Sequence, residues 1–394
     1  MAVFGTTGLV VALSASLAVV GLAPVPSAAV SAQTALDFTS ETAEIAVPPF
    51  GITAVQADGY GLLTGSNLDS PVPIASMAKV VTALVVLEAH PIPNGTAGDP
   101  IVFDAQDVAW FNESVANAES RADVIEGMEL SQRDVITVML VKSANNYSRT
   151  LARWAFGSDE AFVTAANDWA ARNGLSKTTI ADSSGLNPQT QSSLNDLLVL
   201  GRMALDNPVT AQAVASPVVA IDPIGEIENS NKLLGTLGVN GIKTGTTDEA
   251  GACLLFSANL PVGDASIRII GVTVGAPDHD SLDAALSSML ESIQAGFHVV
   301  TPTTSGQVLA TATTAWNSAV PLVSAETVSR IVWSSTPVTV SLPATVGGVG
   351  GINSSASAVT VQFGDEVVVV EMLRSISMDD PGLAWRVTHV GELF

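Results

Sequence analysis

Residues 73–89 read PIASMAKVVTALVVLEA, and they predict a helix buried in the centre of a folded domain. The apolar residues of 77–89 fall on all sides of a helix, which is typical of a helix enclosed by protein. A turn with two prolines precedes it and forces extended backbone ahead of its first residue. Lys79 is the only charged residue between Asp69 and Glu88, so a lone amine is carried into apolar surroundings.

Ser76 lies at the start of this helix, and Lys79 follows three residues later on the same face. A serine hydroxyl is a poor nucleophile until a neighbouring base removes its proton. An amine can be that base if burial lowers its pKa toward neutrality. Ser-x-x-Lys is nevertheless common by chance, and a capping serine with a surface lysine is the ordinary alternative.

A second motif, Ser143-Ala144-Asn145, falls at the break between two predicted helices. A short loop there can aim a hydroxyl and a carboxamide into one cleft. Ser143 could relay a proton to a leaving amine, and Asn145 could hold a substrate amide or Lys79. Taken alone, the motif is also compatible with an ordinary loop or helix cap.

A third motif, Lys243-Thr244-Gly245-Thr246, lies in a predicted strand after the turn signal Asn240-Gly241. A cation and hydroxyls on an edge strand suit a carboxylate ligand. Gly245 lets a substrate backbone approach closely, and a peptide along that edge would gain strand-like hydrogen bonds. The alternative is an exposed strand end with a solvated lysine.

The order and spacing of the three motifs point to one catalytic site. Ser-x-x-Lys precedes Ser-x-Asn by 67 residues, and Lys-Thr-Gly follows 100 residues later. Together they resemble the signature of serine penicillin-binding proteins and serine β-lactamases. Ser-Ala-Asn and the stretches 239–247 and 250–253 look like the low-molecular-weight D-alanyl-D-alanine carboxypeptidases, as does the loop 182–186. The resemblance covers about residues 45 to 300.

The resemblance implies a fold and a reaction. Ser76, deprotonated by Lys79, would attack the carbonyl between the two terminal D-alanines of a peptidoglycan stem peptide. The backbone N–H groups of Ser76 and Thr246 would form the oxyanion hole. Ser143 and Lys243 would help to protonate the departing D-alanine. β-Lactam antibiotics would act as covalent inhibitors on Ser76, and no cofactor is implied.

The same resemblance assigns substrate binding to the third motif and to Asn145. Asn145 would position the substrate amide. Lys243, Thr244 and Thr246 would read the terminal carboxylate, with Gly245 between the two threonines. Well-known members also carry arginines near this carboxylate site. The corresponding stretches here, 227–231 and 275–280, contain none, which leaves substrate preference open.

Composition excludes several other classes of protein. Of the 394 residues, 47% are apolar and only 13% are charged, which excludes a disordered chain. The formal net charge of −23 disfavours a nucleic acid partner. Four scattered histidines and one cysteine give no metal-ligand pattern. Cys253 sits in an apolar run, where a buried small hydrophobe is expected.

The pattern of elements predicts an α+β protein. Strand signals, a central helical block, and then strands with a closing helix at 282–297 suggest an antiparallel sheet with helices against it. Beyond residue 300 the composition shifts to alternating Thr, Ser and Val. Taken with the resemblance described above, which implies a catalytic domain of the penicillin-binding and β-lactamase-like type, we expect that domain over 33–299. The composition predicts a small all-β domain over 300–394.

Residues 1–32 are expected to be a signal peptide or an N-terminal anchor. Residues 10–22 are apolar or small, and 30–32 offer small residues for cleavage. The run is short for a membrane span unless it extends back to Val3. The chain is thus expected outside the cytoplasm, secreted or tethered to the outer face of the membrane. The resemblance also leads one to expect an amphipathic C-terminal helix, but residues 385–390 alternate as in a strand.

Alternatives remain open at this stage. A β-lactamase would need a Glu-x-x-x-Asn loop to activate water, and residues 182–196 contain no glutamate. A D,D-endopeptidase would use the same residues as a carboxypeptidase. A non-catalytic cell-wall-binding scaffold would have no need to retain Ser76, Lys79, Ser143 and Lys243.

Overall fold

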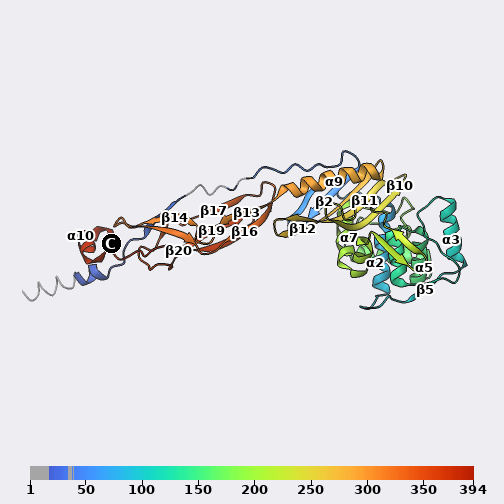
Figure 1. Cartoon of the computed structure of the whole chain (residues 1–394), viewed down its shortest axis with the longest axis horizontal. Helices are drawn as coiled ribbons and strands as arrows, with labels where there is room; N and C mark the ends of the chain where they lie inside the picture. Colours follow the sequence, from blue (N-terminus) through green and yellow to red (C-terminus); the bar gives the residue numbers. More distant parts are fainter. Residues whose placement is uncertain (1–16, 34–37, 39) are drawn as a thin grey trace, which may run out of the picture. The chain divides into compact units, whose positions relative to one another are not determined.

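The computed structural model describes residues 17–33, 38 and 40–394, and these form two compact units (Figure 1). One unit comprises Glu44–Ala295. The other comprises Gly296–Phe394 together with the described residues up to Ala43. All three predicted motifs lie in the first unit.

The first unit is built on a five-stranded antiparallel sheet, as the strand signals predicted. In spatial order its strands are β10 (Val239–Thr247), β11 (Gly251–Val262), β12 (Ala265–Ala276), β2 (Ile52–Ala57) and β3 (Gly61–Gly65). The prediction of a turn at Asn240-Gly241 is wrong. Both residues belong to β10, where the pairing with β11 shifts register, so the Asn-Gly signal marks a bulge.

Helices form the rest of this unit, with α2 (Ala78–Ala89) in its core. From Ala78 to Leu87 every residue of α2 is buried, which confirms the predicted enclosed helix. The other helices are α3 (Ala105–Ala116), α4 (Gln132–Val141), α5 (Asn145–Phe156), α6 (Asp159–Arg172), α7 (Leu194–Asp206), α8 (Pro208–Ala215) and α9 (His279–Gly296). Short strand pairs connect them: β4 (Val72–Pro73) with β7 (Gln191–Ser192), β5 (Pro100–Val102) with β6 (Glu129–Ser131), and β8 (Val218–Ile221) with β9 (Gly225–Glu228).

The helix boundaries follow from caps that the sequence displays. Ser131 and Ser158 accept a hydrogen bond from the backbone N–H groups of Asp134 and Ala161, as expected for the starts of α4 and α6. Helix α7 packs on the sheet at Gly201, where a methyl group would crowd side chains of three strands. Asn207-Pro208 ends α7 and also opens α8, because Asn207 caps the N-terminus of α8 and proline suits the first helical position.

The second unit is mainly antiparallel sheet, in agreement with the predicted β-rich C-terminal region. Its seven-stranded sheet runs β17 (Val338–Ser341), β19 (Ser355–Phe363), β20 (Glu366–Arg374), β15 (Ala319–Ser324), β14 (Val308–Thr313), β1 (Ala28–Ala32) and β18 (Thr345–Val346). Strands β13 (Phe297–Thr303) and β16 (Val328–Trp333) form a separate pair. Strand β1 comes from the stretch that we interpreted as a leader, and it pairs with β14 and β18 on its two sides.

The predicted strand at residues 385–390 is wrong. Helix α10 (Gly382–Thr388) and the 3-10 turn η2 (Val390–Glu392) occupy this stretch. Asp380 accepts hydrogen bonds from the backbone N–H of Gly382 and from Arg386, and these bonds close the first turn. The ring of Trp385 stacks on that of His389 four residues later. Local hydrogen bonds to Asp380 and the i, i+4 ring contact therefore outweigh the apolar alternation.

Within the described part of the chain, no helix is both long enough and apolar enough to cross a membrane. Most of the apolar run at 10–22 lies outside the described residues.

Candidate active site

Ser76 lies in a short 3-10 turn, η1 (Ala75–Met77), that leads directly into α2. The residue before it, Ala75, has φ of +46°, a left-handed conformation that side chains rarely adopt. Two glycines allow neighbouring segments to close on this turn. A Cβ at Gly245 would lie 3.0 Å from the Ser76 nitrogen, and one at Gly185 would lie 1.8 Å from the Ala75 oxygen. The turn that carries Ser76 is thus packed between strand β10 and the 182–186 loop.

Lys79 points from the first turn of α2 to Ser76. Its Nζ lies 2.7 Å from Ser76 Oγ, 2.7 Å from Asn145 Oδ1 and 2.9 Å from the carbonyl oxygen of Ser184. The side chain is 0% exposed. The alternative of a surface lysine is therefore wrong, and so is a capping role for Ser76, whose side chain caps no helix.

The environment of Lys79 suits a base. Burial lowers the pKa of the Lys79 amine to about 7, while the charges of Asp182 and then Glu119 act in the opposite direction. An amine with a pKa near neutrality is available in its free form at physiological pH. Its position against the hydroxyl of Ser76 lets it accept the serine proton.

The loop at 182–186 holds Lys79 from the other side. Ser184 offers its carbonyl oxygen to Lys79, and Ser183 offers its own to the hydroxyl of Thr82 in α2. The carboxylate of Asp182 organises this loop by accepting hydrogen bonds from Ser184 N, Ser184 Oγ, Gly185 N, Leu186 N and Thr190 Oγ1. The sequence pointed to this loop only by resemblance and assigned it no role.

Ser143 lies in the loop between α4 and α5, and Asn145 begins α5, so the motif falls at a break between two helices as predicted. Ser143 is 5% exposed and has φ of +59°, and Asn145 is the first residue of α5. Of the two partners expected for Asn145, the structure contains the contact with Lys79. Its amide also donates to Glu119 Oε2 at 3.2 Å. Glu119 had no motif around it, so the sequence offered no signal for this contact.

Lys243 is buried on β10 beside the same site. Its Nζ lies 3.1 Å from the carbonyl oxygen of Thr244 and 3.5 Å from Ser230 Oγ. With 1% exposure it is not the solvated lysine of the alternative interpretation. Burial and then the nearby charge of Lys79 hold the pKa of Lys243 well below its usual value. Ser230 and Thr244 share a hydrogen bond of 2.6 Å, so the two hydroxyls form one polar edge.

Thr246 lies further along the same strand and is exposed to solvent. Its Oγ1 is 2.7 Å from Nε2 of His279, the first residue of α9. His279 belongs to the stretch 275–280, which drew attention only for its lack of arginine. The sequence thus marked this place but did not identify the residue that occupies it.

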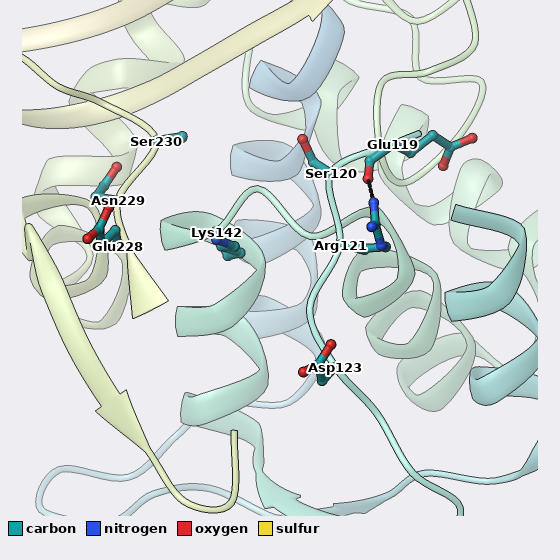
Figure 2. A pocket seen from close by; sticks show the side chains of 8 residues that line it. All are labelled: Glu119, Ser120, Arg121, Asp123, Lys142, Glu228, Asn229 and Ser230. Carbon is teal, nitrogen blue, oxygen red and sulfur yellow. Dashed lines mark hydrogen bonds between the residues drawn. The ribbon is translucent and has the colours of Figure 1, made fainter. Parts of the chain in front are cut away.

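A pocket of about 510 Å³ borders the motifs (Figure 2). Ser230 lines it on one side, and the segment that carries Glu119 lines it on the other, where Arg121 donates to the Glu119 carbonyl oxygen. Its charged lining residues are of both signs: Glu119, Asp123, Glu228, Arg121 and Lys142. The pocket therefore suits a ligand with charged or polar groups.

Two further predictions concern metals and thiols. Among residues 17–33, 38 and 40–394, no three His, Cys, Asp or Glu side chains gather as metal ligands would. Cys253 is a free, buried thiol, as predicted. Burial raises its pKa to about 12, so it is not a reactive thiolate.

Comparisons with known proteins identify the family. The sequence profile of the family described as D-alanyl-D-alanine carboxypeptidase matches residues 51–278, more than half of the chain. The carboxypeptidase DacC of Escherichia coli is 30% identical over 220 residues, which cover 55% of this chain and 53% of that protein. A D-alanyl-D-alanine endopeptidase of Pseudomonas aeruginosa is 29% identical over 247 residues, covering 57% and 76%.

Solved structures support the fold. Penicillin-binding protein 5 of Haemophilus influenzae matches with a TM-score of 0.58 at 20% identity, covering 86% of this chain and 98% of that chain. This confirms the predicted α+β penicillin-binding fold with a β-rich C-terminal region. The chain spans only about half to two thirds of the length of the curated carboxypeptidases that it matches, with 53% for DacC and 63% for DacF of Bacillus subtilis.

Proposed function

The chain belongs to the D-alanyl-D-alanine carboxypeptidase family, and on that premise we propose that it removes the terminal D-alanine from peptidoglycan stem peptides. The observation that carries the proposal is the position of Lys79. A fully buried amine with a pKa near 7 lies 2.7 Å from the hydroxyl of Ser76. A purely structural pair would have no need for a base held close to neutrality.

Acylation begins when Lys79 takes the proton of Ser76. The serine oxygen attacks the carbonyl carbon between the two terminal D-alanines, and the carbonyl oxygen becomes an oxyanion. The backbone N–H groups of Ser76 and Thr246 stabilise this oxyanion. Support for the pairing comes from the close approach of β10 to the turn of Ser76, since a Cβ added at Gly245 would lie 3.0 Å from the Ser76 nitrogen.

Collapse of the intermediate breaks the peptide bond and releases D-alanine as an amine. That nitrogen needs a proton, and Ser143 with Lys243 supplies it. Asn145 keeps Lys79 in place through its Oδ1 and positions the substrate amide. Thr244, Gly245 and Thr246 bind the end of the peptide that carries the carboxylate. Water then cleaves the acyl ester on Ser76 and releases the shortened peptide.

The remaining peptide extends from the reacting bond into the neighbouring pocket. Its charged lining, with Glu119 and Arg121 on one side and Glu228 near Ser230 on the other, suits a peptide with ionised side chains (Figure 2). Penicillin offers a reactive amide beside a carboxylate, so it acylates Ser76 in the same way and blocks the site.

Penicillin labelling tests the nucleophile. We expect the full-length protein to gain the mass of one penicillin, mapped to Ser76 by peptide mass spectrometry and absent in Ser76→Ala. Release of D-alanine from a stem-peptide mimic is the second readout. Folded protein that forms no adduct and releases no D-alanine would contradict the proposal. An adduct lost within seconds would instead identify a β-lactamase.

A D,D-endopeptidase is the second candidate, because one relative carries that name and aligns over 76% of its own length. The same site would then cleave a D-alanyl bond within a crosslink. Parallel assays on a linear pentapeptide and on a crosslinked peptide dimer separate the two activities, and the larger kcat/KM identifies the preferred substrate.

Such substrates lie outside the cytoplasm, which fits the apolar N-terminal run. We propose that the protein is exported and is either secreted or tethered by residues before the catalytic unit. In this proposal the predicted domain over 33–299 contains the catalytic residues. The predicted domain over 300–394 is a spacer or a partner-binding module.

A further inference from the structure

We propose that His279 is a further substrate-binding residue, which recognises the carboxylate of the leaving D-alanine together with Thr246. This inference rests on the proposed function and names the residue that completes its carboxylate site. The sequence motif alone ends at Thr246. His279 reaches that site from a segment 33 residues further along the chain.

The position of His279 is the first support. Thr246 is exposed near the end of β10, on the edge strand that also carries Lys243 and Thr244. The imidazole Nε2 lies 2.7 Å from Thr246 Oγ1, and the ring is half-buried. A ligand that reaches the Thr246 hydroxyl therefore lies within reach of the imidazole.

The hydrogen-bonding capacity of this pair is the second support. A threonine hydroxyl has one proton to donate and can accept further hydrogen bonds. When Nε2–H of His279 donates to Thr246, the threonine proton is left free for an anion. A protonated imidazole can only donate, so it fixes this direction. The pair then presents a hydroxyl donor beside a positive charge, which suits a carboxylate.

The surrounding charges are the third support. The charges of Lys243 on β10 and of Lys232 on the loop before it act on His279, and so do those of the neighbouring carboxylates Asp278 and Asp280. Both carboxylates have partners of their own. Asp278 accepts from the backbone N–H of Ser281 at 2.7 Å, and Asp280 lies 3.9 Å from Lys232. The imidazole thus keeps its capacity for an external anion.

Protonation of His279 should be linked to binding. Burial and then the charges of Lys243 and Lys232 lower the pKa of His279 below its usual value, while Asp278 and Asp280 act in the other direction. A bound carboxylate adds negative charge at this place and favours the protonated imidazole. By linkage, the protonated form binds the carboxylate more tightly, and the preference weakens as pH rises through this pKa.

The competing explanation is that His279 only links α9 to β10 through its hydrogen bond with Thr246. The ratio of kcat/KM for two substrates separates this structural role from carboxylate recognition. The full-length protein is assayed with two thioesters of the same N-acyl-D-alanine. The leaving thiol of one carries a carboxylate, and that of the other carries a carboxamide. The ratio of their kcat/KM values reports carboxylate preference, and titration of Lys79 cancels because both reactions need it.

Three variants of His279 and one control are compared. His279→Ala removes the interaction, His279→Gln keeps a neutral hydrogen-bonding partner for Thr246, and His279→Arg supplies a permanent cation. The control is His389→Gln, which alters a hydrogen-bonded, stacked histidine in the other unit.

We expect the wild-type preference to fall by about tenfold as pH rises through the His279 pKa, the difference between a charged and a neutral hydrogen bond. His279→Ala and His279→Gln should show the low preference at every pH, and His279→Arg a high preference that does not change with pH. His389→Gln should match the wild type. A preference that stays at the wild-type level in folded His279→Ala and His279→Gln would overturn the proposal.

Equal losses of kcat/KM with both thioesters in His279→Ala, restored in His279→Gln, would also overturn the proposal. They would show that His279 only links α9 to β10. Failure of the proposed function looks different. In that case the wild-type protein itself would hydrolyse neither thioester and form no penicillin adduct, and the inference on His279 would fall with it.

Discussion

The two buried lysines of the site show how one residue type is prepared for two tasks. Lys79 contacts Ser76, Asn145 and a backbone carbonyl, and two carboxylates partly offset the effect of its burial. Lys243 faces hydroxyls and a backbone carbonyl, and besides burial it is the charge of Lys79 that lowers its pKa. The first environment suits a base poised near neutrality. The second suits a group that gains a counterion when an anionic substrate arrives.

This contrast divides the site into a deep half and an open half. The deep half, around Lys79, is complete in the free protein, and every polar contact of the amine is internal. The open half runs along Ser230, Thr246 and His279, which are exposed or half-buried. In the proposed reaction, chemistry would thus depend on residues that packing holds in place, and substrate choice on residues at the surface.

The largest effect is expected from replacing Lys79, the proposed base of the deep half. Lys79→Met keeps much of the side-chain volume but cannot accept the proton of Ser76. We expect acylation by penicillin to fall by at least about a thousandfold, because the serine loses its activation. Rates from stopped-flow or intact-mass measurements provide the test. The fold should persist, since a buried amine is replaced by an apolar group.

Lys177→Met is a suitable control, because it changes the same residue type outside the three motifs. Near-normal acylation by a folded Lys79→Met protein would assign the base to another group and remove the basis of the comparison.

The next effect concerns the contact between the two halves. Gly245→Ala would place a methyl group 3.0 Å from the Ser76 nitrogen and from the Ala75 side chain. The strand or the turn that carries Ser76 must shift, so we expect a loss of about ten- to a hundredfold in acylation rate. A thermal melt checks that the fold survives. Gly391→Ala, which has no atom within 4 Å of the added carbon, is the matched control. Unchanged acylation would mean that β10 does not need to approach Ser76 so closely.

A smaller effect concerns the pH dependence of acylation, which reports the pKa of Lys79. Only the neutral amine accepts a proton, so the acylation rate should rise with pH through a pKa near 7. Glu119→Gln removes a negative charge that favours the protonated amine. The pKa of Lys79 should then fall further, and the rising limb should move to lower pH by a few tenths of a unit to about one unit.

Glu113→Gln supplies the control for this pH profile, because Glu113 is an exposed carboxylate of α3 paired with Arg149. A limb that stays in place in Glu119→Gln, or moves to higher pH, would show that Glu119 does not act on Lys79 through its charge.

The same division explains how much the sequence could reveal. Ser76, Lys79, Asn145 and Lys243 are local motifs on predictable elements, and burial explains their chemistry. Glu119 and Asp182 act through long-range contacts with the loop and the amine, and a single sequence contains no signal for such pairing. His279 was within a stretch already marked, but only the packing of α9 beside β10 reveals its partner.

The errors outside the site have a related cause. Alternation of apolar residues predicted a strand at 385–390, yet this stretch is helical and Asp380 accepts hydrogen bonds from its first turn. Likewise Asn240-Gly241 has the composition of a turn, but pairing with β11 extends the strand through it. The first pattern was outweighed by local hydrogen bonds between neighbouring residues, and the second by pairing with another strand of the sheet.

The smallest effect on penicillin acylation should come from deleting residues 1–32. The same deletion tests the interpretation of these residues as a leader. Removing residues 1–32 also removes β1, which pairs with β14 and β18 and contributes the buried Ala28 to the core of the second unit. Loss of its backbone hydrogen bonds should destabilise that unit by about 2 to 4 kcal/mol. For a unit of this size the unfolding temperature should fall by on the order of 10 °C. Penicillin acylation should stay within about twofold of the full-length rate, because all the predicted catalytic residues lie in the other unit.

A chain that begins at Leu17 keeps β1 and is the matched control for calorimetry. If both truncated chains melt alike, β1 is dispensable and cleavage after Ala32 is compatible with the folded protein. If only the shorter chain loses stability, the second unit needs Ala28–Ala32, and any leader must end before that strand. A large loss of acylation in the shorter chain would contradict the division itself, since the chemistry would then depend on the unit that holds none of its residues.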